Sequence, residues 1–335
     1  MKRTIIAIIL VASLVVAYLL FAKGDVSPEQ PNVDGLTSVD IGYSRLRISL
    51  PVFVAKEKGF FEEFGIDANL EMYETAQPLM QALLEGRVDV AGYTALPITY
   101  NGMLRSGKDL YFVSIMVEDQ EHRISYLLRP VTEAGESPKI KSVKDLEGKV
   151  VGILPTIAYK SWLEAILIEN GLTPDQDVII QQTAPTLQSQ ALRSGGVDAL
   201  FTNDPSATSA IRTGVAELIS DEVEVPAYLG SPFPFGSFNV SKEWADSNPE
   251  TMSNIAKALE KAIDFVNANP EEAKDFMKPY LPEQFQSHVQ FYPDAQYMKM
   301  GKSNEKILQD AADQYLDIGI INKPLNLSGL TYEQP

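Results

Sequence analysis

Nine polar side chains stand at or just beyond the ends of predicted strands, where they could hold a small molecule. The strands are predicted at 39–43, 88–93 and 110–116 in the first half of the chain, and at 149–153 and 197–201 in the second. In open α/β sheets, ligands bind in the crevice beyond the carboxyl ends of the strands. The nine candidate ligand-binding residues are Ser44, Arg45, Tyr93, Thr94, Glu118, Thr156, Tyr159, Asn203 and Asp204.

Three of these side chains have distinct recognition chemistry. Arg45 could bind an anion through two hydrogen bonds, and the carboxylate of Glu118 would select an amine or a protonated ring nitrogen. Thr156 precedes a helix predicted at 157–169, whose free N–H groups favour an anion. Simpler roles remain open, because Arg45 and Glu118 could be solvated charges, and Thr156 and Thr94 could each only cap a helix.

We expect the ligand to lie between two groups of residues, one from each half of the chain. One group is Arg45 and Thr94, and the other is Thr156, Tyr159 and Asp204. This lining mixes a base, an acid and an aromatic ring, which suits a small zwitterionic or heterocyclic organic molecule. The residue types do not decide between a sulfonate and a pyrimidine.

Composition argues against several other kinds of chemistry. The chain has no cysteine, which removes thiolate metal sites, a cysteine nucleophile and a lipid-modified N-terminal cysteine. It has two histidines, His122 and His288, and neither a glycine-rich nucleotide-binding motif nor a metalloprotease motif. The one dense cluster of possible metal ligands, 118–122, lies where adjacent strand residues point to opposite faces. We therefore expect no catalytic residue, no metal and no cofactor.

The net charge argues against partners that carry phosphate. The chain has 45 acidic and 28 basic residues, which gives a net charge of −17. Such a protein repels a nucleic acid. We therefore expect no nucleic-acid partner, and a small molecule remains the expected ligand.

The sequence repeats itself at an offset of about 110 residues. The segment 81–90, QALLEGRVDV, matches the segment 190–199, QALRSGGVDA, at an offset of 109. A second match pairs 39–42 with 150–153 and places their glycines 110 residues apart. Glycine-ended helices before strands are common in α/β proteins, but two matches at nearly one offset favour duplication of a whole lobe.

Strands alternate with helices within each copy, which predicts an α/β fold with two doubly wound, mainly parallel sheets. Two such sheets that face each other across their carboxyl ends form a cleft. The first lobe is predicted at 39–128, the second at 129–224, and the return to the first lobe with a helical C-terminal tail at 225–335. The aromatic, proline-rich run 223–238 has no period, and we interpret it as a packed loop or as a loop that supplies one ring to the cleft.

The first residues have the pattern of an export signal. Lys2 and Arg3 precede 19 uncharged residues, 4–22, enough at about 1.5 Å per residue to cross a hydrocarbon layer of ~30 Å. This length favours an uncleaved anchor helix at 1–23, with a cleaved signal as the alternative. The basic flank predicts an extracytoplasmic body, joined to the helix by a tether at 24–38.

Several segments resemble one family of solute-binding proteins. The segments are 51–66, PVFVAKEKGFFEEFGI; 82–91, ALLEGRVDVA; 140–152, IKSVKDLEGKVVG; and Val197–Ala199 with Asp204-Pro205. They resemble the solute-binding proteins of ATP-binding-cassette (ABC) importers for sulfonates, nitrate, taurine and pyrimidine precursors, over roughly residues 39–290. The resemblance implies a bilobed, hinge-closing periplasmic-binding-protein fold that delivers a small solute to an ABC permease in the membrane.

The same superfamily includes pyrimidine-precursor synthases, which are marked by a cysteine-rich motif and an active-site histidine. This chain departs from that branch, since it has no cysteine and no histidine before His122. We therefore expect a monomeric binding protein and not an enzyme, in the periplasm or at the cell surface. The N-terminal helix would hold it near its permease and raise its effective concentration there. A synthase-like enzyme on the same fold and a surface ligand sensor are the alternatives.

Overall fold

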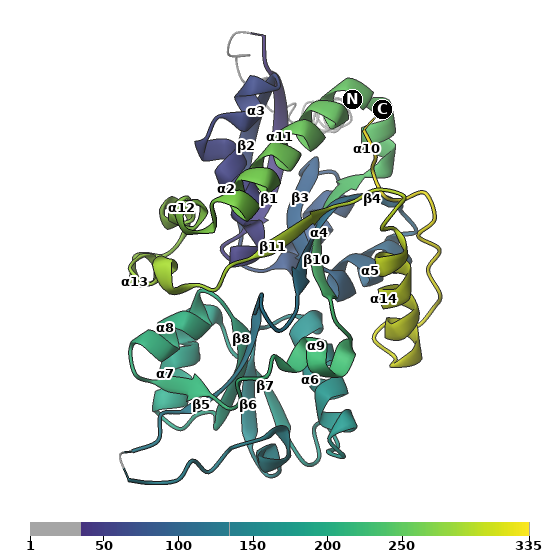
Figure 1. The fold of residues 1–335 in the computed structure, drawn as a ribbon. Coiled ribbons are helices and arrows are strands. Elements are labelled where there is room, and N and C mark those ends of the chain that lie inside the picture. Colours follow the sequence, from purple (N-terminus) through teal and green to yellow (C-terminus); the bar gives the residue numbers. More distant parts are fainter. Residues whose placement is uncertain (1–34, 134, 335) are drawn as a thin grey trace, which may run out of the picture. The chain divides into compact units, whose positions relative to one another are not determined.

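The computed structural model describes residues 35–133 and 135–334, and the chain from Thr37 onward forms one compact unit (Figure 1). The anchor helix predicted at 1–23 and the tether residues 24–34 lie outside the described residues. The last two residues of the predicted tether, Thr37 and Ser38, begin the first strand. Within the part that the structure describes, no helix combines the length and the apolar character needed to cross a membrane.

The first lobe is built on a six-stranded sheet with the order β11-β4-β10-β3-β1-β2 (Figure 1). Strand β1 pairs in parallel with β2 and β3, whereas β10 lies antiparallel between β3 and β4, and β11 pairs antiparallel with β4. The strands are β1 (Thr37–Ser44), β2 (Ile66–Tyr73), β3 (Val90–Ala95), β4 (Leu110–Glu118), β10 (Phe233–Ser241) and β11 (Gln296–Lys299).

The second lobe is built on a five-stranded sheet with the order β7-β6-β8-β5-β9. Strand β6 pairs in parallel with β7 and β8, and β5 lies antiparallel between β8 and β9. The strands are β5 (Ser125–Pro130), β6 (Val150–Ile153), β7 (Ile179–Gln182), β8 (Ala199–Asn203) and β9 (Ala216–Leu218). The lobe boundary predicted between residues 128 and 129 falls inside β5.

The two sheets share one topology. The order β2-β1-β3-β10-β4 in the first lobe corresponds to β7-β6-β8-β5-β9 in the second. In each sheet the inserted antiparallel strand comes from a crossover: the chain leaves the first lobe along β5 and returns along β10. Each sheet is therefore mixed, where the alternation of strands and helices had predicted mainly parallel pairing. The shared order supports the predicted duplication.

The repeated Val-Asp motif has the same structural role in both lobes. The Oδ2 atom of Asp89 accepts a hydrogen bond from the Asp40 amide at 3.0 Å, and the Asp89 amide donates to the Asp40 carbonyl at 2.9 Å. Asp198 makes the same two bonds with Val150, at 2.8 and 2.7 Å. Each aspartate thus fixes the start of one strand, β3 or β8, against the neighbouring parallel strand, β1 or β6.

The two glycines of the second sequence match sit where a side chain would clash. A Cβ atom at Gly42 would lie 2.2 Å from Cδ1 of Leu79, and one at Gly152 would lie 2.9 Å from Cδ2 of Leu200. Gly42 is in β1 and Gly152 is in β6, the corresponding strands of the two lobes, and Leu79 of α4 (Ala76–Leu84) and Leu200 of β8 approach them closely. The close approach explains why glycine recurs at this position.

Helices cover both sheets, and the C-terminal tail returns to the first lobe. Helix α11 packs on α2 and α3, α12 packs on α2, and α14 packs on β10 (Figure 1). The helices of the first lobe are α2 (Leu50–Glu57), α3 (Phe60–Glu63), α4 (Ala76–Leu84), α5 (Leu96–Ser106), α10 (Lys242–Ser247), α11 (Pro249–Ala268), α12 (Pro270–Asp275), α13 (Glu283–Gln286) and α14 (Lys306–Asp317). Those of the second lobe are α6 (Ile157–Glu169), α7 (Gln188–Arg193), α8 (Ser206–Arg212) and α9 (Glu224–Leu229).

The interpretation of 223–238 as a loop is wrong. This run forms α9 and most of β10. Eight of the nine β10 residues are buried, because the strand is inserted between β3 and β4 and covered on both faces. A strand buried on both faces does not alternate between apolar and polar residues, which explains the missing period.

Candidate functional site

A small cavity lies between the lobes at the carboxyl ends of their parallel strands. Its volume is about 30 Å³, which admits one or two water molecules. The lobes are therefore closed in this structure, and a larger solute requires them to separate. The residues that line the cavity are Leu46, Ile48, Glu74, Thr75, Ala76, Ala95 and Ile98 from the first lobe, Leu154, Thr156, Tyr159, Pro185 and Asn203 from the second, and Phe235 of β10.

Three helices begin at this cavity. The residues that precede α4, α5 and α6 are Thr75, Ala95 and Thr156, and all three line it. The hydroxyl of Thr156 caps α6 by accepting a hydrogen bond from the Tyr159 amide at 3.3 Å, whereas α4 and α5 have no side-chain cap. The first N–H groups of a helix have no partner within it and carry partial positive charge. Their convergence favours an anionic group in the cavity.

Two buried polar atoms at the cavity lack hydrogen-bond partners among the described residues. They are the hydroxyl oxygen of Tyr159 and Oδ1 of Asn203, which lie near each other without a hydrogen bond of normal geometry. Burial, together with the negative charges of Glu118 and Asp204, raises the pKa of Tyr159 well above its usual value. The phenol is therefore a donor at neutral pH, and an acceptor on a solute would satisfy it.

Aromatic rings form one wall of the cavity. Phe235 of β10 lies 6.3 Å from Tyr159, measured between ring centroids, and 4.8 Å from the buried Trp162 behind it. The returning strand therefore supplies one ring to the cleft, as one of the two interpretations of 223–238 expected. This wall suits the apolar part of a solute.

Arg47 and Asp204 join the two lobes beside the cavity. Arg47 lies in the 3-10 helix Arg47–Ser49, and its Nε atom is 3.6 Å from Oδ2 of Asp204. Asp204 also accepts hydrogen bonds from the Tyr126 hydroxyl at 2.9 Å and the Thr208 amide at 3.1 Å. Burial, the largest single effect, lowers the pKa of the Arg47 guanidinium, but Asp204 together with Tyr126, Tyr297 and Glu118 raises that pKa above its usual value. Asp204, predicted to bind ligand, therefore pairs with a residue of the chain itself.

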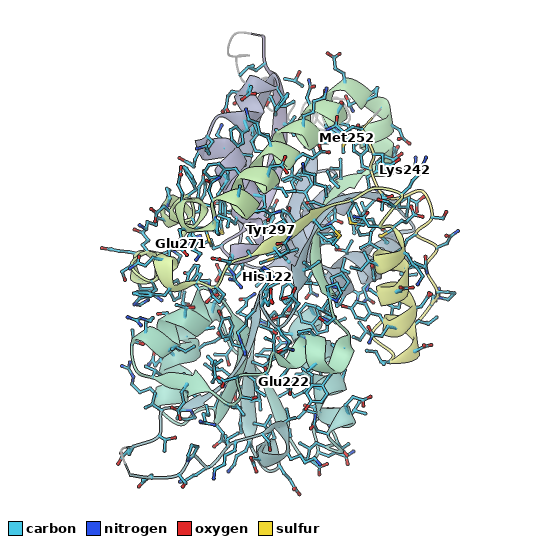
Figure 2. All side chains as sticks on the ribbon, in the orientation of Figure 1. His122, Glu222, Lys242, Met252, Glu271 and Tyr297 are labelled. Atoms are coloured by element: carbon cyan, nitrogen blue, oxygen red, sulfur yellow. The ribbon has the colours of Figure 1, made fainter. Side chains whose placement is uncertain are left out.

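The segment that carries Arg47 is held in place by the tail. The guanidinium donates to the backbone carbonyls of Arg123 and Pro293. Tyr297, which is labelled in Figure 2, lies in β11. Its hydroxyl donates to the Arg47 carbonyl at 2.8 Å. The crossover, the tail and the second lobe thus all contact one arginine.

Arg45 lines a second, neighbouring cavity. This cavity has a volume of about 40 Å³ and shares Leu46, Glu74 and Pro185 with the first. The Nε atom of Arg45 is buried and has no hydrogen-bond partner among the described residues. Arg45 is therefore near the predicted site but does not line the cavity that Thr156, Tyr159 and Asn203 share.

Glu118 lies at the crossover between the lobes. Its Oε1 atom accepts hydrogen bonds from the Ile124 amide at 2.7 Å and from the Ser125 hydroxyl at 2.8 Å, so it joins the end of β4 to the start of β5. Burial raises the pKa of Glu118 above its usual value, although these hydrogen bonds oppose the shift. His122, which is labelled in Figure 2, lies in the same crossover, and its ring bonds with Asp119 at 3.0 Å. Among the described residues, no group of acidic and histidine side chains is placed to hold a metal ion.

Three further predicted residues, like Arg45, Glu118 and Asp204, do not line the cavity. Tyr93 is in the core of the first lobe, where its hydroxyl bonds with Ser114 at 2.5 Å. The hydroxyl of Thr94 bonds with that of Thr99 at 2.7 Å and accepts from the Asn239 amide group at 2.9 Å. Ser44 is buried, and its hydroxyl has no partner among the described residues.

Sequence reasoning missed the cavity residues that follow β2. Glu74, Thr75 and Ala76 come directly after that strand, and α4 begins at Ala76. The rule that selected the other candidates, polar residues at the carboxyl ends of strands, would have selected Glu74 and Thr75 as well. Arg47 gave no comparable signal, because its partner is 157 residues away in the chain.

Two sheets of one topology, joined by crossovers and closed on a small cavity, define the periplasmic-binding-protein fold. The chain belongs to the NMT1-like family, whose model matches residues 34–279. The fold is similar to that of the alkanesulfonate-binding protein SsuA from Xanthomonas axonopodis pv. citri bound to MOPS, with a TM-score of 0.69 and 19% identity over 90% of this chain and 99% of that one. For the periplasmic nitrate-binding protein NrtA from Synechocystis PCC 6803, the TM-score is 0.63 at 14% identity, over 85% of this chain and 82% of that one.

Curated relatives are similar over about two thirds of this chain. The nitrate import ATP-binding protein NrtC of Synechocystis is 24% identical over 240 residues, which are 68% of this chain and 35% of NrtC. The nitrate/nitrite binding protein NrtA of Nostoc is 22% identical over 244 residues, which are 68% of this chain and 53% of NrtA. The chain thus spans about a third to a half of the length of these relatives.

Proposed function

We propose that the protein is the extracytoplasmic solute-binding subunit of an ABC importer, and that it captures a small anionic organic solute between its lobes. The observation that carries the proposal is the interlobe cavity, where three helices begin and where Tyr159 and Asn203 present unpartnered polar atoms. The names of the relatives support it, because they include a nitrate/nitrite binding protein and a sulfonate-binding protein.

The cavity favours an anion over an amine. Helix N-termini attract negative charge, and the Tyr159 hydroxyl is a donor. Among the residues that line the cavity, Glu74 is the one carboxylate, and its side chain is exposed. The apolar wall around Phe235 favours a solute with a short hydrocarbon part, such as an aliphatic sulfonate.

Capture without chemistry fits the groups that are present. Neither histidine lines the cavity, and His122 bonds instead with Asp119. The crossovers that contain 119–124 and 219–232 act as the hinge in this proposal. The permease recognises the surface that the two lobes form together when they are closed. The similarity to an import ATP-binding protein supports an ABC transporter as the partner.

Titration calorimetry on the full chain tests the proposal. The solutes are butanesulfonate, nitrate, uracil and butylamine. Butanesulfonate and butylamine share a butyl chain and differ in the charge of the head group. We expect butanesulfonate to bind with micromolar or lower Kd and butylamine not to bind. Binding of butylamine alone would contradict the anionic assignment, and failure of every solute at millimolar concentration would contradict the function.

The variant Asn203→Ala shows whether binding uses this cavity. Loss of a buried hydrogen-bond partner for a charged group weakens binding by about ten-fold or more. Asn239→Ala is the matched control, because Asn239 is also buried but bonds within the first lobe, to Thr94. If both variants bind equally well, the solute lies elsewhere.

A further inference from the structure

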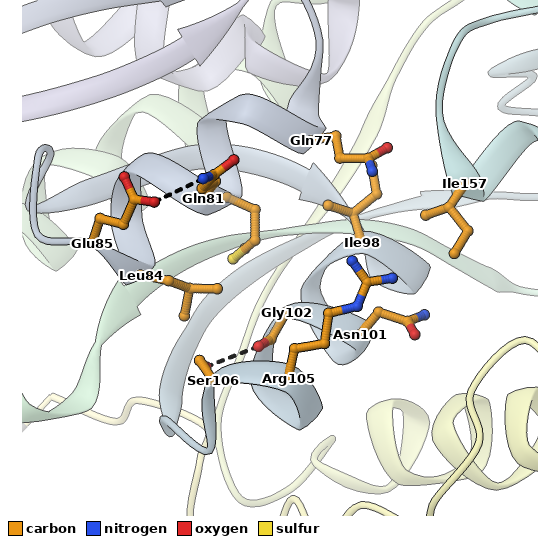
Figure 3. Close-up of a pocket in the computed structure, with 11 residues that line it drawn as sticks. Gln77, Gln81, Leu84, Glu85, Ile98, Asn101, Gly102, Arg105, Ser106 and Ile157 are labelled. Atoms are coloured by element: carbon orange, nitrogen blue, oxygen red, sulfur yellow. Dashed lines mark hydrogen bonds between the residues drawn. The ribbon is translucent and has the colours of Figure 1, made fainter.

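A larger groove opens on the surface beside the interlobe cavity. It lies between α4 and α5, has a volume of about 480 Å³, and reaches Ile157 at the start of α6 (Figure 3). Gly102 of α5 forms part of its floor, where a Cβ atom would lie 3.0 Å from Cγ of Met80 in α4. The side chains around the rim are mostly polar: Gln77, Gln81, Glu85, Asn101, Arg105 and Ser106.

The groove and the cavity are separated by single residues. Ile98 lines both spaces. Gln77 lines the groove, whereas Ala76, the residue before it, lines the cavity. Likewise Ile157 lines the groove, whereas Thr156, the residue before it, lines the cavity. The first turns of α4, α5 and α6 therefore form the wall between the two spaces. Ile98 comes from the first lobe and Ile157 from the second, so separation of the lobes moves them apart.

Arg105 supplies a positive charge to this groove. Its side chain is exposed, and it makes no ion pair within the described part of the chain. Figure 3 shows its guanidinium group pointing along the groove toward the end where Ile98 and Ile157 lie. The whole chain has a net charge of −17, which repels anions. The carboxylate of Glu85, which also lines the groove, is paired with Arg87 at 2.9 Å, so the charge of Arg105 lowers the barrier to the approach of anions locally.

We propose that this groove is the entrance through which an anionic solute reaches the interlobe cavity, that Ile98 and Ile157 form its gate, and that Arg105 attracts the solute into it. The inference rests on the proposed function, since it needs a solute that binds in the cavity. It adds the route, the two residues that close it and a residue that sets the association rate for anions.

Stopped-flow fluorescence measures the two rate constants that the proposal concerns. The chain has two tryptophans, and Trp162 lies behind the cavity wall, 5.4 Å from the ring of Tyr159 and 4.8 Å from that of Phe235. In a Trp244→Phe background, Trp162 alone reports on the cavity. The full chain is mixed with butanesulfonate, and kon and koff are obtained from the concentration dependence of the observed rate.

Ile157→Ala tests the gate. Ile157 lines the groove and not the cavity, so a smaller side chain speeds passage in both directions. We expect kon and koff to rise together by about three-fold or more, and Kd to stay within about two-fold, because a change to the barrier alone leaves the equilibrium unchanged. Ile168→Ala, an exposed isoleucine of the same helix outside the groove, is the control and leaves both constants unchanged. A rise in koff alone would show that Ile157 only stabilises the closed form, and would overturn the gate.

Arg105→Gln tests the attraction of anions. We expect kon for butanesulfonate to fall by about three-fold at low salt with koff unchanged, and the difference to vanish at high salt, where screening removes it. Arg193→Gln is the control, because it changes the net charge equally from an exposed position in the second lobe, outside the groove. An equal effect of both variants would overturn the role of Arg105.

The two proposals fail in different ways. If the unmodified protein binds neither butanesulfonate nor nitrate in calorimetry, the proposed function fails and the entrance fails with it. If it binds either anion but Ile157→Ala and Arg105→Gln both keep the unmodified rate constants, only the entrance is overturned.

Discussion

Arg47 and Asp204 form a buried ion pair between the lobes, with 3.6 Å between Nε and Oδ2 and side chains that are 2% and 0% exposed. Arg47 follows β1 in the first lobe, and Asp204 follows β8 in the second. The same guanidinium donates to backbone carbonyls of the crossover and of the C-terminal tail, at Arg123 and Pro293. One side chain of the first lobe thus contacts the second lobe, the crossover and the C-terminal tail, and the contact with Asp204 must break when the lobes separate.

Arg47→Met is expected to lower the free energy of unfolding by about 3 kcal/mol, because it leaves the buried carboxylate of Asp204 without its opposite charge. Urea denaturation followed by circular dichroism measures this. Lys302→Met is the control, since Lys302 is 83% exposed and 3.9 Å from Glu333, and an exposed pair contributes less than about 1 kcal/mol. Equal losses in the two variants would show that the buried pair has no special part in stability.

The same variant is expected to bind solute more weakly, because the ion pair exists only while the lobes are closed. Small-angle X-ray scattering of Arg47→Met without solute would then show a larger radius of gyration than that of the unmodified protein. An unchanged radius, together with unchanged affinity, would mean that other contacts keep the lobes closed.

Stability is expected to fall with rising pH through Glu224. Burial raises the pKa of Glu224 from its ordinary 4.5 to about 7, with Glu118 adding to the shift and Arg123 opposing it. A carboxyl group whose pKa is raised by folding favours the folded state while protonated, so its contribution is complete below pH 4.5 and is lost as the pH rises through 7. The loss is on the order of 3 kcal/mol.

Glu224→Gln removes this pH dependence. The difference in unfolding free energy between the variant and the unmodified protein should grow in favour of the variant between pH 4.5 and 7 and then level off. Glu222→Gln, at an exposed position two residues away, should show no such trend. A difference that does not change with pH would mean that Glu224 ionises in the folded state as it does in the unfolded state.

Elements whose caps, turns and periodicity lie within their own residues could be predicted from the sequence. A helix was predicted at 157–169 after Thr156, and α6 has those bounds. The strand β10 was missed because its character depends on insertion between β3 and β4, which are far from it in the sequence. Pairing partners of that kind leave no periodic signal in the strand itself.

In the candidate site, too, residues with a local signal could be predicted and residues defined by distant contacts could not. Thr156, Tyr159 and Asn203 line the cavity, and each was selected from its place after a strand or at the start of a helix. Arg45 was selected where Arg47 makes the contact between the lobes, because a 3-10 helix turns the chain after β1 and buries Arg47. Whether the lining residues contact a solute remains a prediction.

Tyr159→Phe is expected to change stability and affinity in opposite directions. The Tyr159 hydroxyl is buried without a partner in the described structure, so its removal should raise the unfolding free energy of the solute-free protein by about 1 kcal/mol. Loss of the donor should weaken butanesulfonate binding about ten-fold. Tyr292→Phe is the control, because its hydroxyl is also buried and unpartnered but does not line the cavity. It should be stabilised without a loss of affinity, and equal affinities of both variants would remove Tyr159 from the site.

The duplicated aspartates, Asp89 and Asp198, are expected to stabilise their lobes independently. Each accepts a hydrogen bond from the backbone of the neighbouring first strand, at 3.0 and 2.8 Å, so Asp89→Ala and Asp198→Ala should each lower the unfolding free energy by about 1–2 kcal/mol. Asp→Asn at either position keeps an acceptor oxygen and should lower the unfolding free energy less.

The two aspartates lie in different lobes and share no partner, so the double alanine variant should lose the sum of the single losses to within about 0.5 kcal/mol. Neither residue lines the cavity, and the affinity for butanesulfonate should stay unchanged in all these variants. A double-variant loss well below the sum would mean that the lobes do not unfold as one unit, and a fall in affinity would mean that the strand starts help to position the cavity.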